Sequence, residues 1–153
     1  MTSPQFAVRS PAVPRKGTLG YGLGFLAYIP IPFVGMLVAA IAMAGVYSAA
    51  RKQGGVAAEN ARRAANWGLT VLAVMALLVV SFIVLLNVFN GSTGFFPIGL
   101  PVIGFLLLSV VHVIVCIMGL VIGNRGDVFE NALAIPFYSA DTPAAVPAAT
   151  PAS

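Results

Sequence analysis

The amino-acid sequence predicts an all-α fold, a polytopic membrane helix bundle with four transmembrane helices. Of its 153 residues, 59% are hydrophobic and only 8% are charged, whereas soluble domains carry about 25% charged residues. The apolar residues form long blocks of the length that a helical membrane span needs. All eight Lys and Arg residues fall on one side of the membrane if the chain crosses four times. Together these observations exclude a water-soluble globular protein.

The first apolar block, residues 17–50, is too long for one crossing and is interrupted by Pro30 and Pro32. Proline lacks the amide donor and disfavours helical geometry in the preceding residue, so two prolines this close usually end a helix. A hairpin with spans at 17–29 and 33–50 is therefore predicted, with a single kinked helix as the alternative. A single helix would place the basic residues of the N-terminal tail opposite those of the next loop, which disfavours it. The first span is short, so a re-entrant segment also stays open.

The other two blocks, residues 67–89 and 102–122, each predict one membrane span. About fifteen residues of the block 67–89 are Leu, Ile, Val or Phe, which favours its insertion into the bilayer by roughly 7 kcal/mol. The β-branched residues of the second do not oppose a helix, because lipid leaves no partner for an open backbone. The bundle is thus expected to occupy residues 17–137, between a disordered N-terminal tail (1–16) and a disordered Pro- and Ala-rich C-terminal tail (138–153). Both termini are expected to be cytoplasmic, and the protein to lie in the cell (inner or plasma) membrane.

An amphipathic helix is predicted just before the span at 67–89. At 100° per residue, the polar residues gather on one face and the small residues on the other. The polar face is a candidate interaction face for lipid headgroups or a partner, or it is simply solvated; it consists of Glu59, Arg62, Arg63 and Asn66. Candidate helix-packing positions, where a small side chain permits close approach, are Ala61, Ala65 and Gly68 here and Gly119 and Gly123 in the last span.

Few residues could carry chemistry inside the membrane. The candidate intramembrane polar residues are His112, Ser109 and Asn87. An intramembrane histidine suggests a proton relay or a ligand contact, but a neutral, hydrogen-bonded histidine accounts for the same placement. Because a zinc site needs three or four ligands, His112 and the single Cys116 do not predict one. No catalytic residue, metal site or cofactor is expected.

Three short motifs resemble the Tic-twenty-like family, small bacterial four-helix membrane proteins related to a component of chloroplast protein import. They are ENARRAANWGLT at residues 59–70, GNRGD at 123–127 and NALAIPF at 131–137. The resemblance implies four membrane helices and no enzyme activity.

Two functions are compatible with these features. The first is a non-enzymatic component or scaffold that assembles with other membrane proteins or with itself. The alternative is a small-solute or ion pathway, acting as an oligomer around His112, because interrupted helices often line binding sites. The expected partners are the lipid bilayer and membrane proteins, and the scattered positive charge does not predict nucleic-acid binding.

Overall fold

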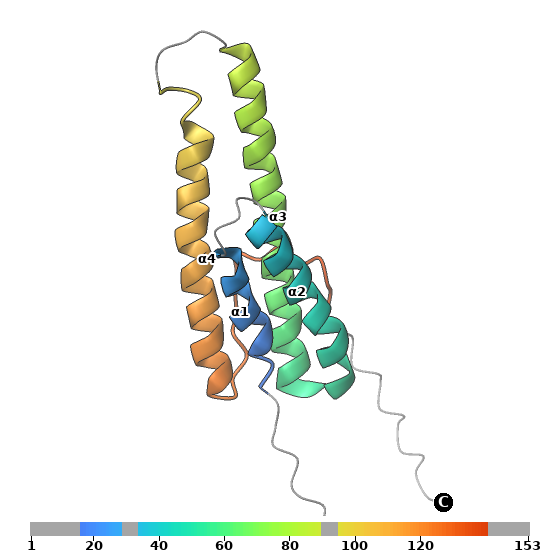
Figure 1. Ribbon diagram of the computed structural model, residues 1–153. Helices are drawn as coiled ribbons and strands as arrows, with labels where there is room; N and C mark the ends of the chain where they lie inside the picture. The colour runs from blue at the N-terminus through green and yellow to red at the C-terminus, as the bar shows by residue number, and fades with distance from the viewer. Residues whose placement is uncertain (1–15, 29–33, 90–94, 141–153) are drawn as a thin grey trace, which may run out of the picture.

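The computed structural model describes residues 16–28, 34–89 and 95–140, and every regular element in these ranges is helical (Figure 1). The chain begins with the short helix α1 (Leu19–Gly24), which continues as the 3-10 turn η1 (Phe25–Tyr28). The helix α2 (Val34–Ala50) ends in the 3-10 turn η2 (Arg51–Gln53). Two long helices follow, α3 (Gly55–Val88) and α4 (Leu100–Asn124).

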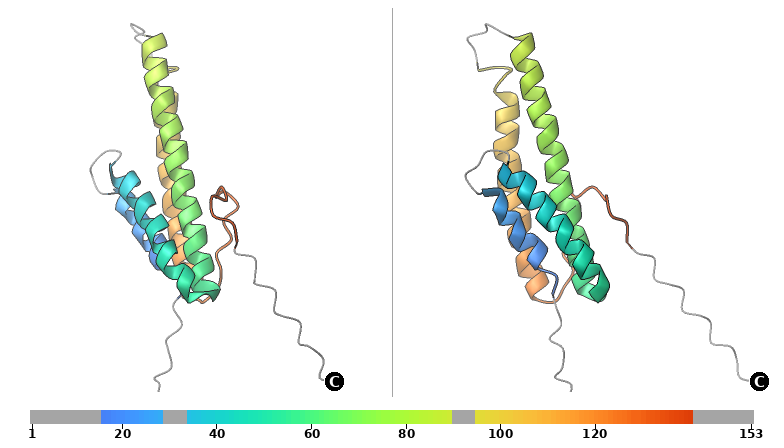
Figure 2. Two further views of the ribbon diagram at one scale, coloured as in Figure 1. Left: turned by 90° about the vertical axis from the view of Figure 1, so that its right-hand side faces the viewer. Right: turned by 45° about the vertical axis from the view of Figure 1, so that its right-hand side comes forward.

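The helix α3 joins the predicted amphipathic segment and the predicted second block into one continuous helix of 34 residues, about 51 Å long. It begins after Gly54, whose φ of 69° reverses the chain after η2. Glycine adopts this left-handed conformation without steric cost. Since the connection is so short, α2 and α3 are antiparallel neighbours (Figure 2).

The hairpin of α1, η1 and α2 packs against only one half of the α3–α4 pair, the half next to η2 (Figures 1 and 2). A Cβ added to Gly68 would lie 3.1–3.4 Å from atoms of Met43 and Ala40, which sets the register of α2 on α3. Near the start of α2, Met36 belongs to the same buried cluster as Met75. The core therefore lies between the hairpin and this half of the long helices.

Three of the described helices are long and apolar enough to cross a membrane: Val34–Gln53, Gly55–Val88 and Leu100–Asn124. The chain is therefore a multi-pass membrane protein. The predicted first span is shorter than expected, because α1 and η1 together form a ten-residue apolar helix from Leu19 to Tyr28. The predicted break at Pro30 and Pro32 lies outside the described residues.

The structure describes a few residues that were expected to belong to the two tails. Lys16 is described, and its Nζ donates a hydrogen bond to the carbonyl oxygen of Asn124. Residues 138–140 are also described, and Tyr138 is hydrogen-bonded to α3. The remaining tail residues, 1–15 and 141–153, lie outside the described ranges.

Close packing of α1 on α4 gives a direct test at Gly119. A Cβ at this position would lie 2.4 Å from the ring of Tyr21, which is fully buried. We expect Gly119→Ala to destabilise the protein by about 1 to 3 kcal/mol, because the ring has no room to move. Thermal unfolding in detergent measures this. The matched control is Gly45→Ala in α2, where no atom lies within 4 Å of the added Cβ; equal effects of the two substitutions would contradict the packing.

Candidate interaction site

The residues after α4 run back along the first half of α3 as an extended segment, residues 127–138, which we call the C-terminal strap (Figure 2). A non-helical backbone beside a membrane bundle needs partners for its N–H and C=O groups, because lipid offers none. Side chains of α3 supply several of these partners. They come from Asn60, Arg62, Asn66 and Thr70.

Asn60 joins three parts of the chain. Its Nδ2 donates to the carbonyl oxygens of Lys16 (3.1 Å) and Asp127 (2.9 Å), and its Oδ1 accepts a hydrogen bond from the backbone N–H of Phe129 (3.0 Å). The side chain is fully buried. Asn60 therefore ties the entry to α1 and the start of the C-terminal strap to α3.

Asn66 and Thr70 hold the other end of the C-terminal strap. The side chain of Asn66 makes two hydrogen bonds with the backbone of Tyr138, one from Tyr138 N–H to Oδ1 (2.7 Å) and one from Nδ2 to the Tyr138 carbonyl (3.1 Å). The hydroxyl of Thr70 accepts from the backbone N–H of Ile135 (2.8 Å) and donates to the carbonyl of Asn66 (2.8 Å). Asn66 and Thr70 thus each donate one hydrogen bond and accept one. Together they fix the register of the strap on α3 at Ile135 and Tyr138.

The charged residues of the predicted interaction face form an ion-pair cluster. Glu59 Oε1 lies 2.6 Å from Nη2 of Arg62 and 2.7 Å from Nε of Arg63. The hydrogen bonds from Arg62, and then those from Arg63, lower the pKa of the Glu59 carboxyl to about 2; this residue lies in the polar first part of α3, before the apolar span. Arg62 also donates to the carbonyl of Tyr138 (2.7 Å), and Arg63 lies 3.6 Å from Glu130.

The predicted interaction face is thus covered in part by the chain's own C-terminal strap. Asn66 is buried, and the Arg62 side chain is only 13% exposed. An entirely solvated face does not fit these positions. The small residues of the opposite face pack closely on α2. Ala61 and Ala65 are fully buried against Tyr47 and Ala50.

His112 lies at the centre of a second polar cluster, between α1, α3 and α4. Its Nδ1 is 3.1 Å from the indole nitrogen of Trp67, and its Nε2 is 3.0 Å from the carbonyl oxygen of Gly24. Because the indole N–H can only donate and a carbonyl can only accept, these partners select the neutral tautomer with the proton on Nε2. Cys116 Sγ lies 3.6 Å from the same nitrogen. Both ring nitrogens of this buried histidine are therefore engaged within the chain.

The other two predicted intramembrane polar residues do not join His112. The Ser109 hydroxyl donates to the carbonyl of Phe105 in its own helix (2.9 Å), and the Asn87 amide donates to the carbonyl of Ile83 (2.7 Å). Only the backbone of Ser109 contacts the hairpin, because its carbonyl accepts from the hydroxyl of Tyr28 in η1. Each of these two side chains is therefore hydrogen-bonded to a backbone carbonyl of its own helix, as is common for polar side chains in membrane helices.

The two glycines of α4 that were predicted for helix packing, Gly119 and Gly123, lie at the contact with α1 and its N-cap, whereas Gly68 lies against α2. A Cβ added at Gly123 would lie 2.7 Å from the side chain of Thr18, and a Cβ added at Gly119 would overlap the ring of Tyr21. Gly24 makes the reciprocal contact from α1, where an added Cβ would lie 2.4 Å from Cys116 Sγ. These close approaches bring the carbonyl of Gly24 within reach of His112.

Three functional positions were missed from the sequence: Asn60, Trp67 and Thr70. Asn60 and Trp67 are seven residues apart and so lie on one helix face, and Asn66 and Thr70 are four apart. Polar side chains at helical spacing in an apolar context were the available signal. Their partners outside α3 could not be identified, because these lie at least 44 residues away along the chain.

The polar side chains of this site are arranged to hold parts of the chain together. Among the described residues, no group of three or more His, Cys, Asp and Glu side chains could hold a metal ion. The polar side chains of α3 instead bind backbone groups of the C-terminal strap. The site is therefore an intramolecular docking site with an ion-pair cluster at its edge.

Comparison with protein families corrects the expected resemblance. The family whose sequence profile matches is the magnetosome magnetite crystal formation protein family (MamF/MmsF), and the match covers residues 17–138. The assignment to the Tic-twenty-like family was wrong, because it relied on three short motifs. No curated protein and no solved structure matches the chain. The match runs from Gly17, two residues before α1, through Tyr138, the strap residue bound by Asn66, and it spans most of the sequence. The chain belongs to the magnetosome magnetite crystal formation protein family.

Proposed function

We propose that this protein is a non-enzymatic membrane component of magnetite crystal formation, acting by assembly with other membrane proteins. Family membership supports a role in magnetite crystal formation. The observation that carries the non-enzymatic role is the engagement of His112, whose two ring nitrogens are held by Trp67 and Gly24. A proton relay or solute pathway would need an ionisable group that exchanges its partners, and this group is fixed by its own chain.

The charge distribution supports an indirect effect on the mineral. The whole chain has only four Asp and Glu residues, and the segment from Asn90 to Leu100 contains no ionisable side chain. Carboxylates are the side chains that bind hard metal ions. This segment has no carboxylate side chain with which to bind an iron oxide surface. The basic residues near η2 and the start of α3 are placed for anionic headgroups or for acidic partner proteins.

Two measurements in a magnetite-forming cell test the proposal. Deletion of the gene should change crystal size or shape in electron micrographs, and the tagged protein should co-purify with other membrane proteins in mild detergent. Complementation with His112→Gln should restore the crystals. A His112→Gln protein that accumulates and folds like the parent, but leaves the crystals as in the deletion strain, would support the pathway alternative instead.

We propose that the end of the molecule carrying η2 and the start of α3 faces the cytoplasm. Its described basic residues are Lys16, Arg51, Lys52, Arg62, Arg63 and Arg125, and the positive-inside bias places such residues on that side. In a Cys116→Ser background, a cysteine at Gln53 should be labelled by an impermeant maleimide from the cytoplasmic side only. A cysteine at the exposed Phe96 should be labelled from the other side only. Labelling of both positions from one side would refute the orientation.

A further inference from the structure

The two halves of the molecule differ in thickness. Every buried residue of α3 lies between Ala57 and Met75, and α4 has none between Val102 and Val111. The thirteen residues of α3 that follow Met75, through Val88, extend about 20 Å beyond Met75. Figures 1 and 2 show this half as two helices alone.

All additional elements lie beside the other half. The described helices of the hairpin, α1 with η1 and α2, reach about the middle of the α3–α4 pair (Figures 1 and 2), and Met36 near the start of α2 and Met75 of α3 are buried in one cluster. The C-terminal strap is held between Asn60 and Thr70. Its exposed apolar side chains, Leu133, Ile135 and Phe137, extend this half further outward. We call this half the wide end and the half made of α3 and α4 alone the narrow end.

The surface of the narrow end is suited to acyl chains. Helix interfaces in membranes are enriched in small residues that let backbones approach. The exposed residues of the narrow end are instead large and branched, and they include Leu77, Val80, Ile83, Val84, Leu86 and Leu106. Its glycine in α4, Gly104, already faces Leu78, whose methyl carbon would lie 2.8 Å from an added Cβ. These features distinguish the narrow end from the glycine- and alanine-lined wide end.

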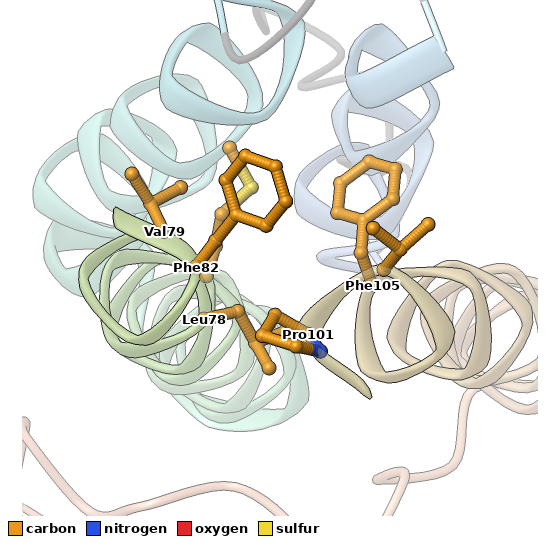
Figure 3. Close-up of a pocket in the computed structure, with 7 residues that line it drawn as sticks. Leu78, Val79, Phe82, Pro101 and Phe105 are labelled. Atoms are coloured by element: carbon orange, nitrogen blue, oxygen red, sulfur yellow. The ribbon is translucent and has the colours of Figure 1, made fainter. Parts of the chain in front are cut away.

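A recess of about 290 Å³ marks the step between the two ends. It is lined by Met75, Leu78, Val79, Phe82, Pro101, Val102 and Phe105. In Figure 3, Phe82 of α3 and Phe105 of α4 point into the same space, beside the ribbons of the hairpin. Since the lining is apolar, hydrocarbon is the solvent that fits it.

From this geometry we infer that the protein is a membrane wedge that favours curvature convex on the side of its wide end. Each helix is about 10 Å across, so the wide end, with the hairpin and the strap added to α3 and α4, occupies roughly twice the area of the narrow end. A protein that displaces more area in one leaflet is accommodated best where that leaflet is expanded. The basic residues mark the wide end as the cytoplasmic one, so the favoured curvature is convex toward the cytoplasm.

The inference requires that the hairpin end inside the bilayer. In a Cys116→Ser background, a cysteine at the exposed Val34, at the start of α2, should resist impermeant maleimide from both sides, whereas a cysteine at Phe96 reacts from the narrow side. Reaction of the Val34 position from the narrow side would show that the hairpin crosses completely, and it would overturn the wedge. The proposed role in crystal formation does not depend on this result.

Orientation in reconstituted vesicles tests the wedge itself. The Gln53→Cys, Cys116→Ser protein is reconstituted into small, strongly curved vesicles and into large, nearly flat vesicles of the same lipid. The fraction labelled from outside reports molecules whose wide end faces outward. We expect a roughly threefold excess of outward over inward wide ends in the small vesicles relative to the large ones, equivalent to a little over RT. Equal ratios in both sizes would overturn the inference.

Two triple substitutions give opposite expected changes. Alanine at Leu133, Ile135 and Phe137 trims the wide end and should reduce the excess. Alanine at Leu77, Leu86 and Leu106 trims the narrow end by exposed residues of the same kind and should preserve or increase it. A second copy or another partner bound in the recess would widen the narrow end. A parent protein that is oligomeric in the vesicles and shows no excess would therefore contradict the wedge and support such an assembly.

Discussion

Asn60→Leu should destabilise the protein by about 2 to 4 kcal/mol, one of the largest effects expected for a single substitution. The leucine fills a similar volume but leaves the carbonyls of Lys16 and Asp127 and the N–H of Phe129 without their partner. Each buried backbone group left unsatisfied costs about 1 to 3 kcal/mol, and membrane proteins lie at the low end of this range. Thermal unfolding in detergent measures the loss.

The matched control is Asn87→Leu, in the same helix. Asn87 is exposed and bonds only to the carbonyl of Ile83, one turn before it, so its replacement should be close to neutral or slightly favourable in lipid. Limited proteolysis supplies a second readout, because loss of Asn60 should release the C-terminal strap and expose residues 127–138 to cleavage. Equal stability of the two variants, with an intact strap in both, would show that Asn60 does not hold the strap.

The long apolar helices could be predicted because their signals are local. Long apolar blocks identify helices whatever they pack against. The assignment of membrane sides from Lys and Arg also uses only local signals, and it stays a prediction. The small residues on one face of residues 57–68 likewise indicated which side of α3 a neighbour could approach. Each of these inferences depends on residues that are close together in the sequence.

The C-terminal strap could not be predicted, because its backbone is held by side chains far away in the sequence. Asn66 and Tyr138 are 72 residues apart, and nothing in either segment identifies the other. The segment 131–137 has neither helical nor strand periodicity, so it was noticed only as a short motif. The same three motifs led to the wrong family, because short matches carry less information than a profile over residues 17–138.

The role of His112 was left open by the sequence for a related reason. Its own helix shows Ser109 and Cys116 on the same face, but the partners that determine its tautomer, Trp67 and Gly24, come from two other elements. A polar residue in a span is ambiguous until those partners are known. Spacing also could not show which helix Gly24 approaches, since that depends on how α1 tilts against α4.

His112→Leu should therefore destabilise the protein by about 2 to 3 kcal/mol, while His112→Gln should stay within about 1 kcal/mol of the parent. Leucine leaves the indole N–H of Trp67 and the carbonyl of Gly24 without partners in the interior. Glutamine can accept from the indole through its amide oxygen and donate to Gly24 through its amide nitrogen. Thermal unfolding in detergent again compares the variants.

Trp67 is the only tryptophan of the chain, so its fluorescence reports on this hydrogen bond directly. Emission of the folded protein should shift to shorter wavelength in His112→Leu, where the indole loses its acceptor, and should change little in His112→Gln. A double-mutant cycle with Trp67→Phe isolates the pair, since the effect of His112→Leu should shrink once the indole is gone. If the two His112 substitutions are equally mild and the emission does not move, the indole does not depend on His112, and the histidine is then free to exchange a proton as the pathway alternative requires.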